Sequence, residues 1–360
     1  MRRSFLDPWL AAKMGLPLDR LCPETVAAWQ LAALRRTLAH AATHSPFYRN
    51  HLAGMDFDGL RASADLAAVP LTTARDLAGQ GQRMLCLSQD QVARVVTLAT
   101  SGTSGPAKRL FFTQEDLAAT LDFFSQGMAT LCGPGDAVLV LLPGRRPDGV
   151  ADLLARALPR IGARAVLPPE NWDPDLLTGL LVSENVTRLV AAPSQVRILL
   201  GHGAFSGAAR ERVRAALISA EPLGPDLRRA MARDWDCEAF DHWGMTETGY
   251  GGGVECAAHD GYHLREAEFL VEIVDPLGTT PLPPGEQGEV VVSTLGRRGL
   301  PLVRYRTGDA ARMLPGPCAC GSPLRRLGPV AGRIEITGTT YRLVQPDKGR
   351  AQPCSSFSNS

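Results

Sequence analysis

The apolar residues of the first part of the chain are spaced as in amphipathic helices. Residues 25–34 combine good helix formers with apolar side chains that return about every three to four positions. The dipeptide Ser45-Pro46 ends this pattern, because a residue that precedes proline disfavours the helical conformation. The spacing predicts a helical region over residues 1–90.

From about residue 91 the pattern changes to short apolar runs that alternate with helical stretches. Each run has the length of a buried strand, and strands alternating with helices are typical of an α/β sheet. The runs cover residues 93–99, 137–142, 163–167, 186–191 and 215–220. The predicted fold class is therefore α/β.

Strands dominate beyond about residue 262. The runs 269–274 and 288–293, with a Pro-Pro-Gly turn between them, predict hairpins. Residues 345–360 are polar and aperiodic, which predicts a disordered tail. We therefore divide the chain into a helical region (1–90), an α/β core with a β-rich lobe (91–333) and a C-terminal remnant (334–360).

Charge and composition exclude several classes of protein. Lys and Arg total 38 against 37 Asp and Glu, so no global field attracts nucleic acid or an anionic membrane. The longest apolar run, residues 137–142, is far shorter than the roughly 20 residues of a membrane helix. Asp7, Pro8 and Lys13 interrupt any apolar stretch behind Arg2-Arg3, so no export signal is predicted. Eight cysteines are too few for a disulfide scaffold, and a cytoplasmic location is expected.

The segment from Thr97 to Lys108 has the composition of a phosphate-binding loop. It follows a predicted strand, and its small residues allow backbone N–H groups and hydroxyls to surround phosphate oxygens. It is not a Walker A loop, because Ala107 precedes the lysine and Arg109 follows it. A polar turn between strands is the alternative. The chain has only three lysines, and the presence of one at the end of this loop favours phosphate binding.

Several further motifs occur in the order that acyl-adenylate-forming enzymes show. They are Ser219-Ala220-Glu221-Pro222-Leu223, Trp243-Gly244-Met245-Thr246-Glu247, Arg304-Tyr305-Arg306-Thr307-Gly308-Asp309 and Gly332-Arg333. With Ser45-Pro46-Phe47-Tyr48-Arg49 and Cys318-x-Cys320-Gly321, the chain most resembles the phenylacetate–CoA ligase branch, over residues 25–335. The resemblance implies an adenylate-forming N-terminal core in which a carboxylate attacks the ATP α-phosphate. A CoA thiol then displaces AMP.

The resemblance also implies a role for each motif residue. The β- and γ-phosphates would be surrounded by Thr100, Ser101, Gly102, Thr103, Ser104, Gly105 and Lys108. Thr246 would contact the α-phosphate, and Glu247 would hold Mg²⁺. The nucleoside would contact Ser219, Ala220 and Glu221 at the adenine edge, Trp243 on the adenine face, Asp309 at the ribose hydroxyls and Arg333 near the ribose and hinge.

Some of these residues also have structural interpretations. Asp309 could cap a turn, Trp243 could belong to the core, and Glu221-Pro222 could begin a helix. Arg304 and Arg306 could serve only as ion-pair partners.

Cysteine and histidine spacing predicts a structural zinc site. Cys256, Cys318 and Cys320, with either His259 or His263, would supply three thiolates and one imidazole, a tetrahedral Zn²⁺ set. Such a site would join the hairpin lobe to the body. The alternative is three unpaired cysteines.

Only residues 334–360 follow Arg333, whereas the family that the motifs resemble continues into a small mobile lid with a catalytic lysine. A lid-less enzyme of partial activity, a lid supplied by a partner chain or homodimer, and a truncated ligase are all consistent with this pattern. We predict ATP-dependent activation of a carboxylic acid, with an aryl acid favoured by the resemblance and CoA or a carrier-protein thiol as acceptor. The alternatives are a silent nucleotide- or acyl-adenylate-binding protein and a zinc-stabilised structural subunit.

Overall fold

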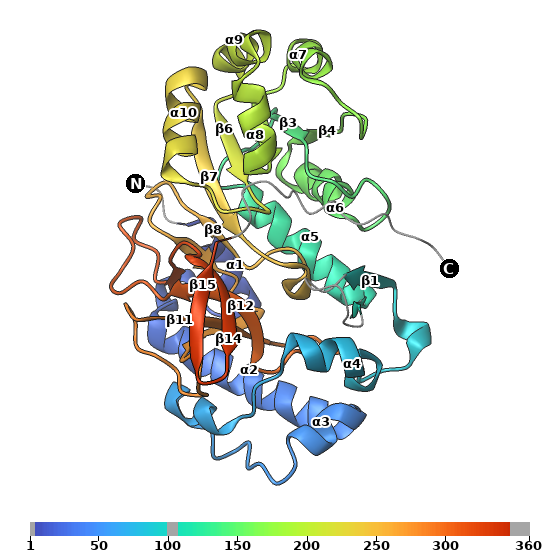
Figure 1. The fold of residues 1–360 in the computed structure, drawn as a ribbon, viewed down its shortest axis with the longest axis vertical. Helices are drawn as coiled ribbons and strands as arrows, with labels where there is room; N and C mark the ends of the chain where they lie inside the picture. Colours follow the sequence, from blue (N-terminus) through green and yellow to red (C-terminus); the bar gives the residue numbers. More distant parts are fainter. Residues whose placement is uncertain (1–3, 99–106, 346–360) are drawn as a thin grey trace. The chain divides into compact units, whose positions relative to one another are not determined.

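The computed structural model describes residues 4–98 and 107–345, which form two compact units (Figure 1). Both units are discontinuous in sequence. The first comprises residues 1–6, 117–263 and 319–321, and the second comprises residues 7–116, 264–318 and 322–360. In the described part of the chain, no helix is long and apolar enough to cross a bilayer.

The first unit contains a parallel sheet in which four of the five core strands correspond to predicted apolar runs. Its parallel strands lie in the order β4-β3-β5-β6-β7. β8 (Gly253–Glu255) pairs antiparallel with β7, and β9 (Tyr262–Leu264) follows β8 in the strand order. The parallel strands are β3 (Ala137–Val140), β4 (Arg164–Val166), β5 (Arg188–Ala191), β6 (Ala215–Ile218) and β7 (Glu238–Trp243).

Helices pack on the sheet through alternate residues of each strand. One core cluster joins Leu139, Ala191 and Ile218 to helices α7 to α10. Val190 and Leu217 precede Ala191 and Ile218 by one residue, so their side chains lie on the other face of the sheet. There they line a cavity together with residues of α5 and α6. This arrangement follows from the two-residue period of a strand. The helices are α5 (Gln114–Met128), α6 (Val150–Ala157), α7 (Pro174–Ser183), α8 (Pro193–Leu200), α9 (Gly203–Arg212) and α10 (Pro225–Trp235).

The second unit contains the predicted N-terminal helices and the β-rich lobe. Its helices are α1 (Leu6–Met14), α2 (Pro23–His44), α3 (Pro46–His51) and α4 (Ala74–Met84). α2 ends before Ser45, whose side chain accepts a hydrogen bond from the Tyr48 N–H at 3.2 Å and so caps α3. Helix α2 therefore stops where the Ser-Pro dipeptide predicts, and a new helix begins there.

An antiparallel sheet of order β10-β11-β12-β14-β15 forms the lobe. β10 (Phe269–Val274) and β11 (Gln287–Thr294) form the predicted hairpin. The remaining strands of the unit are β12 (Tyr305–Arg312), β13 (Arg326–Leu327), β14 (Gly332–Thr337), β15 (Thr340–Val344) and the two-stranded pair β1 (Arg94–Leu98) and β2 (Lys108–Phe112).

Residues 332–344 form a regular hairpin, which the sequence interpretation did not identify. Ile334 and Ile336 pair with Leu343 and Tyr341, and Gly338 in the turn has a φ of +61°. This alternation of apolar residues around a glycine turn was a readable hairpin signal. The predicted disordered tail, apart from Gln345, lies outside the described residues. Among the described residues, the short 3₁₀ helices are η1 (Leu18–Arg20), η2 (Ser63–Ala68), η3 (Gln89–Gln91), η4 (Leu158–Ile161) and η5 (Thr246–Thr248).

Candidate active site and metal cluster

A small cavity lies beside the parallel sheet of the first unit. Its volume is about 40 Å³, and its wall is apolar apart from Ser219, His242 and Tyr250. Ser219 follows directly after β6, and His242 lies near the end of β7. Ligands of open α/β sheets bind outside the carboxyl ends of the strands, which is where these residues lie. The other lining residues are Phe123, Phe124, Gly127, Met128, Leu142, Val150, Leu154, Val190, Leu217 and Val254.

Ser219 and His242 form a hydrogen-bonded pair in this wall. The Ser219 hydroxyl lies 2.9 Å from His242 Nδ1. Burial lowers the pKa of His242 to about 4, so the imidazole is neutral at physiological pH. Sequence reasoning identified Ser219 but missed His242, Phe123 and Tyr250. The available signal for His242 was its position, directly before the Trp-Gly-Met-Thr-Glu motif at the end of a predicted strand.

The glycine-rich segment after β7 lets aromatic rings approach the backbone closely. A Cβ atom at Gly252 would lie 2.4 Å from the Trp243 ring, and one at Gly251 would lie 2.5 Å from the Phe123 ring. Trp243 is therefore buried against Gly252. Thr246 and Glu247 lie in η5, where the Glu247 side chain is buried.

The Ser219-Ala220-Glu221 motif forms a sharp bend after β6. Ala220 has a φ of +72°, which L-residues adopt at a cost in energy and which occurs preferentially at functional sites. The Glu221 carboxylate accepts a hydrogen bond of 2.6 Å from the Ser194 hydroxyl on α8. The motif is thus held in a fixed conformation by its own backbone and by a neighbouring helix.

Two predicted nucleotide residues are neighbours in the second unit. Asp309 and Arg333 face each other in the β12–β14 register and form an ion pair. Lys108 is the first residue of β2 and pairs with Leu98, so it stands at the base of the segment that joins β1 to β2. The loop residues Thr100, Ser101, Gly102, Thr103, Ser104 and Gly105 lie outside the described residues.

Both arginines before Asp309 have ion-pair partners. Arg304 has no exposed surface, and its guanidinium donates to the Glu272 carboxylate at 2.9 and 3.1 Å. It also donates to the carbonyl oxygens of Val69 and Thr279, each at 2.8 Å. Arg306 donates to Glu289 at 2.7 Å. These contacts agree with the ion-pair interpretation of the two residues.

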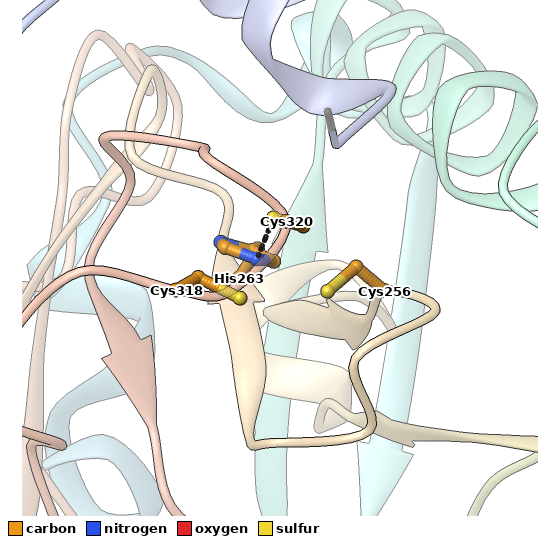
Figure 2. A group of neighbouring side chains, drawn as sticks. All are labelled: Cys256, His263, Cys318 and Cys320. Carbon is orange, nitrogen blue, oxygen red and sulfur yellow. Dashed lines mark hydrogen bonds between the residues drawn. The ribbon is translucent and has the colours of Figure 1, made fainter. Parts of the chain in front are cut away.

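Cys256, His263, Cys318 and Cys320 form a buried cluster (Figure 2). Their ligand atoms all lie within 4.8 Å of one another, and Cys320 Sγ is 3.4 Å from His263 Nε2. Of the two candidate histidines, only His263 joins the thiols. His259 has a φ of +50°, and its ring contacts other groups instead.

The ring of His259 belongs to a polar network that sequence reasoning missed. His259 Nε2 lies 2.9 Å from Glu238, and Nδ1 lies 3.0 Å from the Arg228 guanidinium and 3.3 Å from the Glu255 carboxylate. Arg228 also donates to both oxygens of Glu255, at 2.8 and 2.9 Å. The Glu255 carboxylate accepts from the N–H of Asp241 at 2.8 Å, so the network reaches the strand that carries His242.

Asp241 and His242 are expected to oppose each other in the pH dependence of stability. Burial raises the pKa of Asp241 from 3.8 to about 7, although Tyr262 donates to its carboxylate at 2.7 Å. The folded state therefore binds an extra proton, and this contribution to stability is lost as pH rises from about 4 to 7. The lowered pKa of His242 acts in reverse, because its contribution is lost as pH falls from 6.5 to about 4.

Asp241→Asn removes the contribution of Asp241 to the pH dependence of stability and leaves that of His242. The melting temperature of this variant should rise more steeply between pH 4 and 6.5 than that of the parent protein. Thermal unfolding at several pH values measures the slope. Asp226→Asn is the control, because the Asp226 side chain is 90% exposed. Equal slopes for Asp241→Asn and the parent protein would show that Asp241 is ionised throughout this range.

Residues 59–296 match the family model of AMP-binding enzymes, so the chain belongs to that family. This result confirms the resemblance to adenylate-forming enzymes and the predicted fold class. The chain is 30% identical to phenylacetate-coenzyme A ligase from Pseudomonas putida over 340 residues, 89% of this chain and 73% of the relative. The phenylacetate-coenzyme A ligase from Escherichia coli K12 is 29% identical over 332 residues, with coverages of 89% and 74%.

Solved structures share the fold at lower sequence identity. An open conformation of 2-hydroxyisobutyryl-CoA ligase, in complex with 2-HIB-AMP and CoA, superposes with a TM-score of 0.76 at 19% identity. That superposition covers 89% of this chain and 79% of the ligase. ATP-bound MatB from Rhodopseudomonas palustris superposes with a TM-score of 0.51 at 19% identity, over 72% of this chain and 52% of MatB.

Proposed function

We propose that this protein activates a carboxylic acid with ATP, forming an acyl-adenylate and pyrophosphate, and then transfers the acyl group to the thiol of CoA. The observation that carries the proposal is the cavity at the carboxyl ends of β6 and β7. The motifs that begin at Ser219 and Trp243 lie beside this cavity. The chain belongs to the AMP-binding enzyme family.

In the first step a carboxylate oxygen attacks the α-phosphorus of ATP, and the bond to the β-phosphate breaks. Both reactants are anionic, so the reaction needs charge neutralisation more than a base. We assign Lys108 to the departing phosphates and Thr246 to the α-phosphate. Glu247 has the hard oxygen donor that Mg²⁺ prefers, and Mg²⁺ bound there would neutralise phosphate charge.

In the second step the CoA thiol loses its proton to solvent as its sulfur attacks the acyl carbonyl, and AMP leaves with the electrons of the acyl–oxygen bond. Trp243 and the Ser219-Ala220-Glu221 bend are assigned to the adenine, and Asp309 with Arg333 to the ribose. The Asp309–Arg333 ion pair supports this assignment, because the pair holds the carboxylate in place.

The aryl preference follows from similarity to the phenylacetate-coenzyme A ligases. The apolar cavity wall suits a ring. However, the cavity of about 40 Å³ is smaller than the roughly 150 Å³ that holds benzene. An aryl acid therefore requires side chains to move. Met128, an unbranched residue in the wall, is suited to that movement.

ATP–pyrophosphate exchange tests the proposal. The panel contains phenylacetate, benzoates and aliphatic acids, and product formation is followed separately with CoA and with a carrier-protein thiol. Exchange that depends on one class of acid supports the proposal and identifies the substrate class. ATP binding without exchange for any acid would instead favour the silent nucleotide-binding alternative.

We also propose that Cys256, His263, Cys318 and Cys320 hold a structural Zn²⁺. Three sulfur donors and one imidazole match the tetrahedral coordination of zinc, and four protein ligands leave no open position for catalysis. All four side chains are buried, as expected of a site that stabilises the fold.

Metal analysis of freshly purified protein should find about one zinc ion per chain. Cys318→Ser should lose the metal and melt at a lower temperature, because zinc binding contributes directly to folding. Cys237→Ser is the matched control, since Cys237 is also buried but lies outside the cluster. A metal-free parent protein, or equal metal content in the two variants, would contradict the zinc site.

A further inference from the structure

The polar residues of the cavity wall indicate a chemical feature of the substrate that membership of the family does not predict. Apart from Ser219, His242 and Tyr250, the side chains that line it are apolar. An apolar acid would fill such a cavity without needing a histidine in its wall. The position of His242 therefore requires a chemical explanation.

The Ser219–His242 hydrogen bond leaves one imidazole nitrogen available. Nδ1 lies 2.9 Å from the Ser219 hydroxyl, whereas Nε2 has no hydrogen-bond partner among residues 4–98 and 107–345. If Ser219 donates to Nδ1, then Nε2 carries the proton and is a donor. If Nδ1 donates to Ser219, then Nε2 is an acceptor. In either tautomer the pair offers one hydrogen-bonding position to a ligand.

A hydroxyl group matches both tautomers, because it can donate and accept a hydrogen bond. A charged substituent does not match, since the described residues that line the cavity include no carboxylate, lysine or arginine and His242 is neutral. An unsubstituted ring leaves Nε2 without a partner when it displaces water, which weakens binding. The cavity wall therefore favours a neutral, hydroxyl-bearing acid.

We propose that His242, held by Ser219, is a specificity-determining residue that selects a carboxylic acid carrying a neutral hydroxyl group. This inference rests on the proposed acid-activating function and narrows its substrate class. The hydroxyl group would hydrogen-bond to His242 Nε2, while the rest of the acid contacts apolar residues such as Val190 and Leu217.

Matched pairs of acids test the selection. Phenylacetate and benzoate are each compared with their ortho-, meta- and para-hydroxy derivatives in ATP–pyrophosphate exchange. At least one hydroxy acid should exceed its parent by about tenfold or more in kcat/KM, because leaving a buried polar group unpaired is costly. His242→Leu should remove that preference, and His242→Gln, which keeps a polar side chain, should retain part of it.

The control is His44→Leu, the same change at an exposed position of α2. It should leave the ratio of hydroxy to parent acid unchanged. The proposed selection by His242 is wrong if the parent protein prefers the unsubstituted acids. It is also wrong if His242→Leu lowers kcat/KM equally for both acids of a pair. In either case the proposed acid-activating function stands.

Direct binding separates failure of the inference from failure of the proposed function. Saturation-transfer NMR reports binding of the same acids without turnover. If no acid supports exchange but a hydroxy acid binds in a His242-dependent manner, the selection stands and the activation chemistry fails. If the acids neither exchange nor bind, both proposals are overturned.

Discussion

Lys108→Ala should lower acid-dependent ATP–pyrophosphate exchange by about 10²–10³-fold, the usual cost of removing one aimed group that stabilises the transition state. Lys108 begins β2 at the end of the candidate phosphate loop, where its ammonium group would offset charge on the departing pyrophosphate. The variant should also bind ATP more weakly, because the same charge acts on the ground state. Exchange kinetics and ATP titration measure the two effects.

Lys13→Ala provides the matched control. Lys13 pairs with Glu268 at 3.1 Å and lies 5.4 Å from the centre of the Trp9 ring. Losing these partly exposed contacts should affect stability by about 1 kcal/mol or less and leave exchange unchanged. Unaltered ATP affinity in Lys108→Ala would remove this residue from the phosphate site.

Arg304→Met should destabilise the fold by about 3–5 kcal/mol, because it leaves the buried Glu272 carboxylate without its partner. It also removes the donor to the Val69 and Thr279 carbonyls, which tie the segment before α4 and the turn after β10 to the arginine. Urea unfolding followed by circular dichroism measures the change as a lower midpoint.

Two further variants distinguish a buried charge from simple loss of contacts. Arg342→Met breaks the pair with Glu335 on the β14–β15 hairpin, but the Arg342 side chain is 75% exposed. Arg342→Met should lower the free energy of unfolding by no more than about 1 kcal/mol. The double variant Arg304→Met/Glu272→Met should recover much of the lost stability, since no charge then remains unpaired. No recovery would mean that the carbonyl contacts dominate.

Local patterns were sufficient to predict many elements. The apolar runs at 137–142 and 215–220 became β3 and β6, and the helical spacing at 25–34 lies within α2. These predictions succeeded because strand and helix periods are visible within a few residues. The hairpin at 332–344 carried the same kind of signal, an alternation around Gly338, and was overlooked.

The cavity could not be predicted in the same way. Phe123, Val190 and His242 come from a helix and two strands that are far apart in sequence, and only the folded sheet brings them to one wall. Ser219 was assigned to the adenine edge by resemblance. The structure places it in the cavity wall beside His242, a contact that no spacing rule contains.

The sequence by itself determined the family, the order of the motifs and the set of thiols suited to zinc, because these depend on residue identity and spacing. Only the tertiary structure decided between His259 and His263. The turn at His259 directs that side chain to Glu238 and Arg228, whereas β9 carries His263 to Cys320. The same holds for Arg304, whose burial against Glu272 depends on strand pairing rather than on its own motif. Local sequence specifies which groups are available, and long-range packing specifies which of them meet.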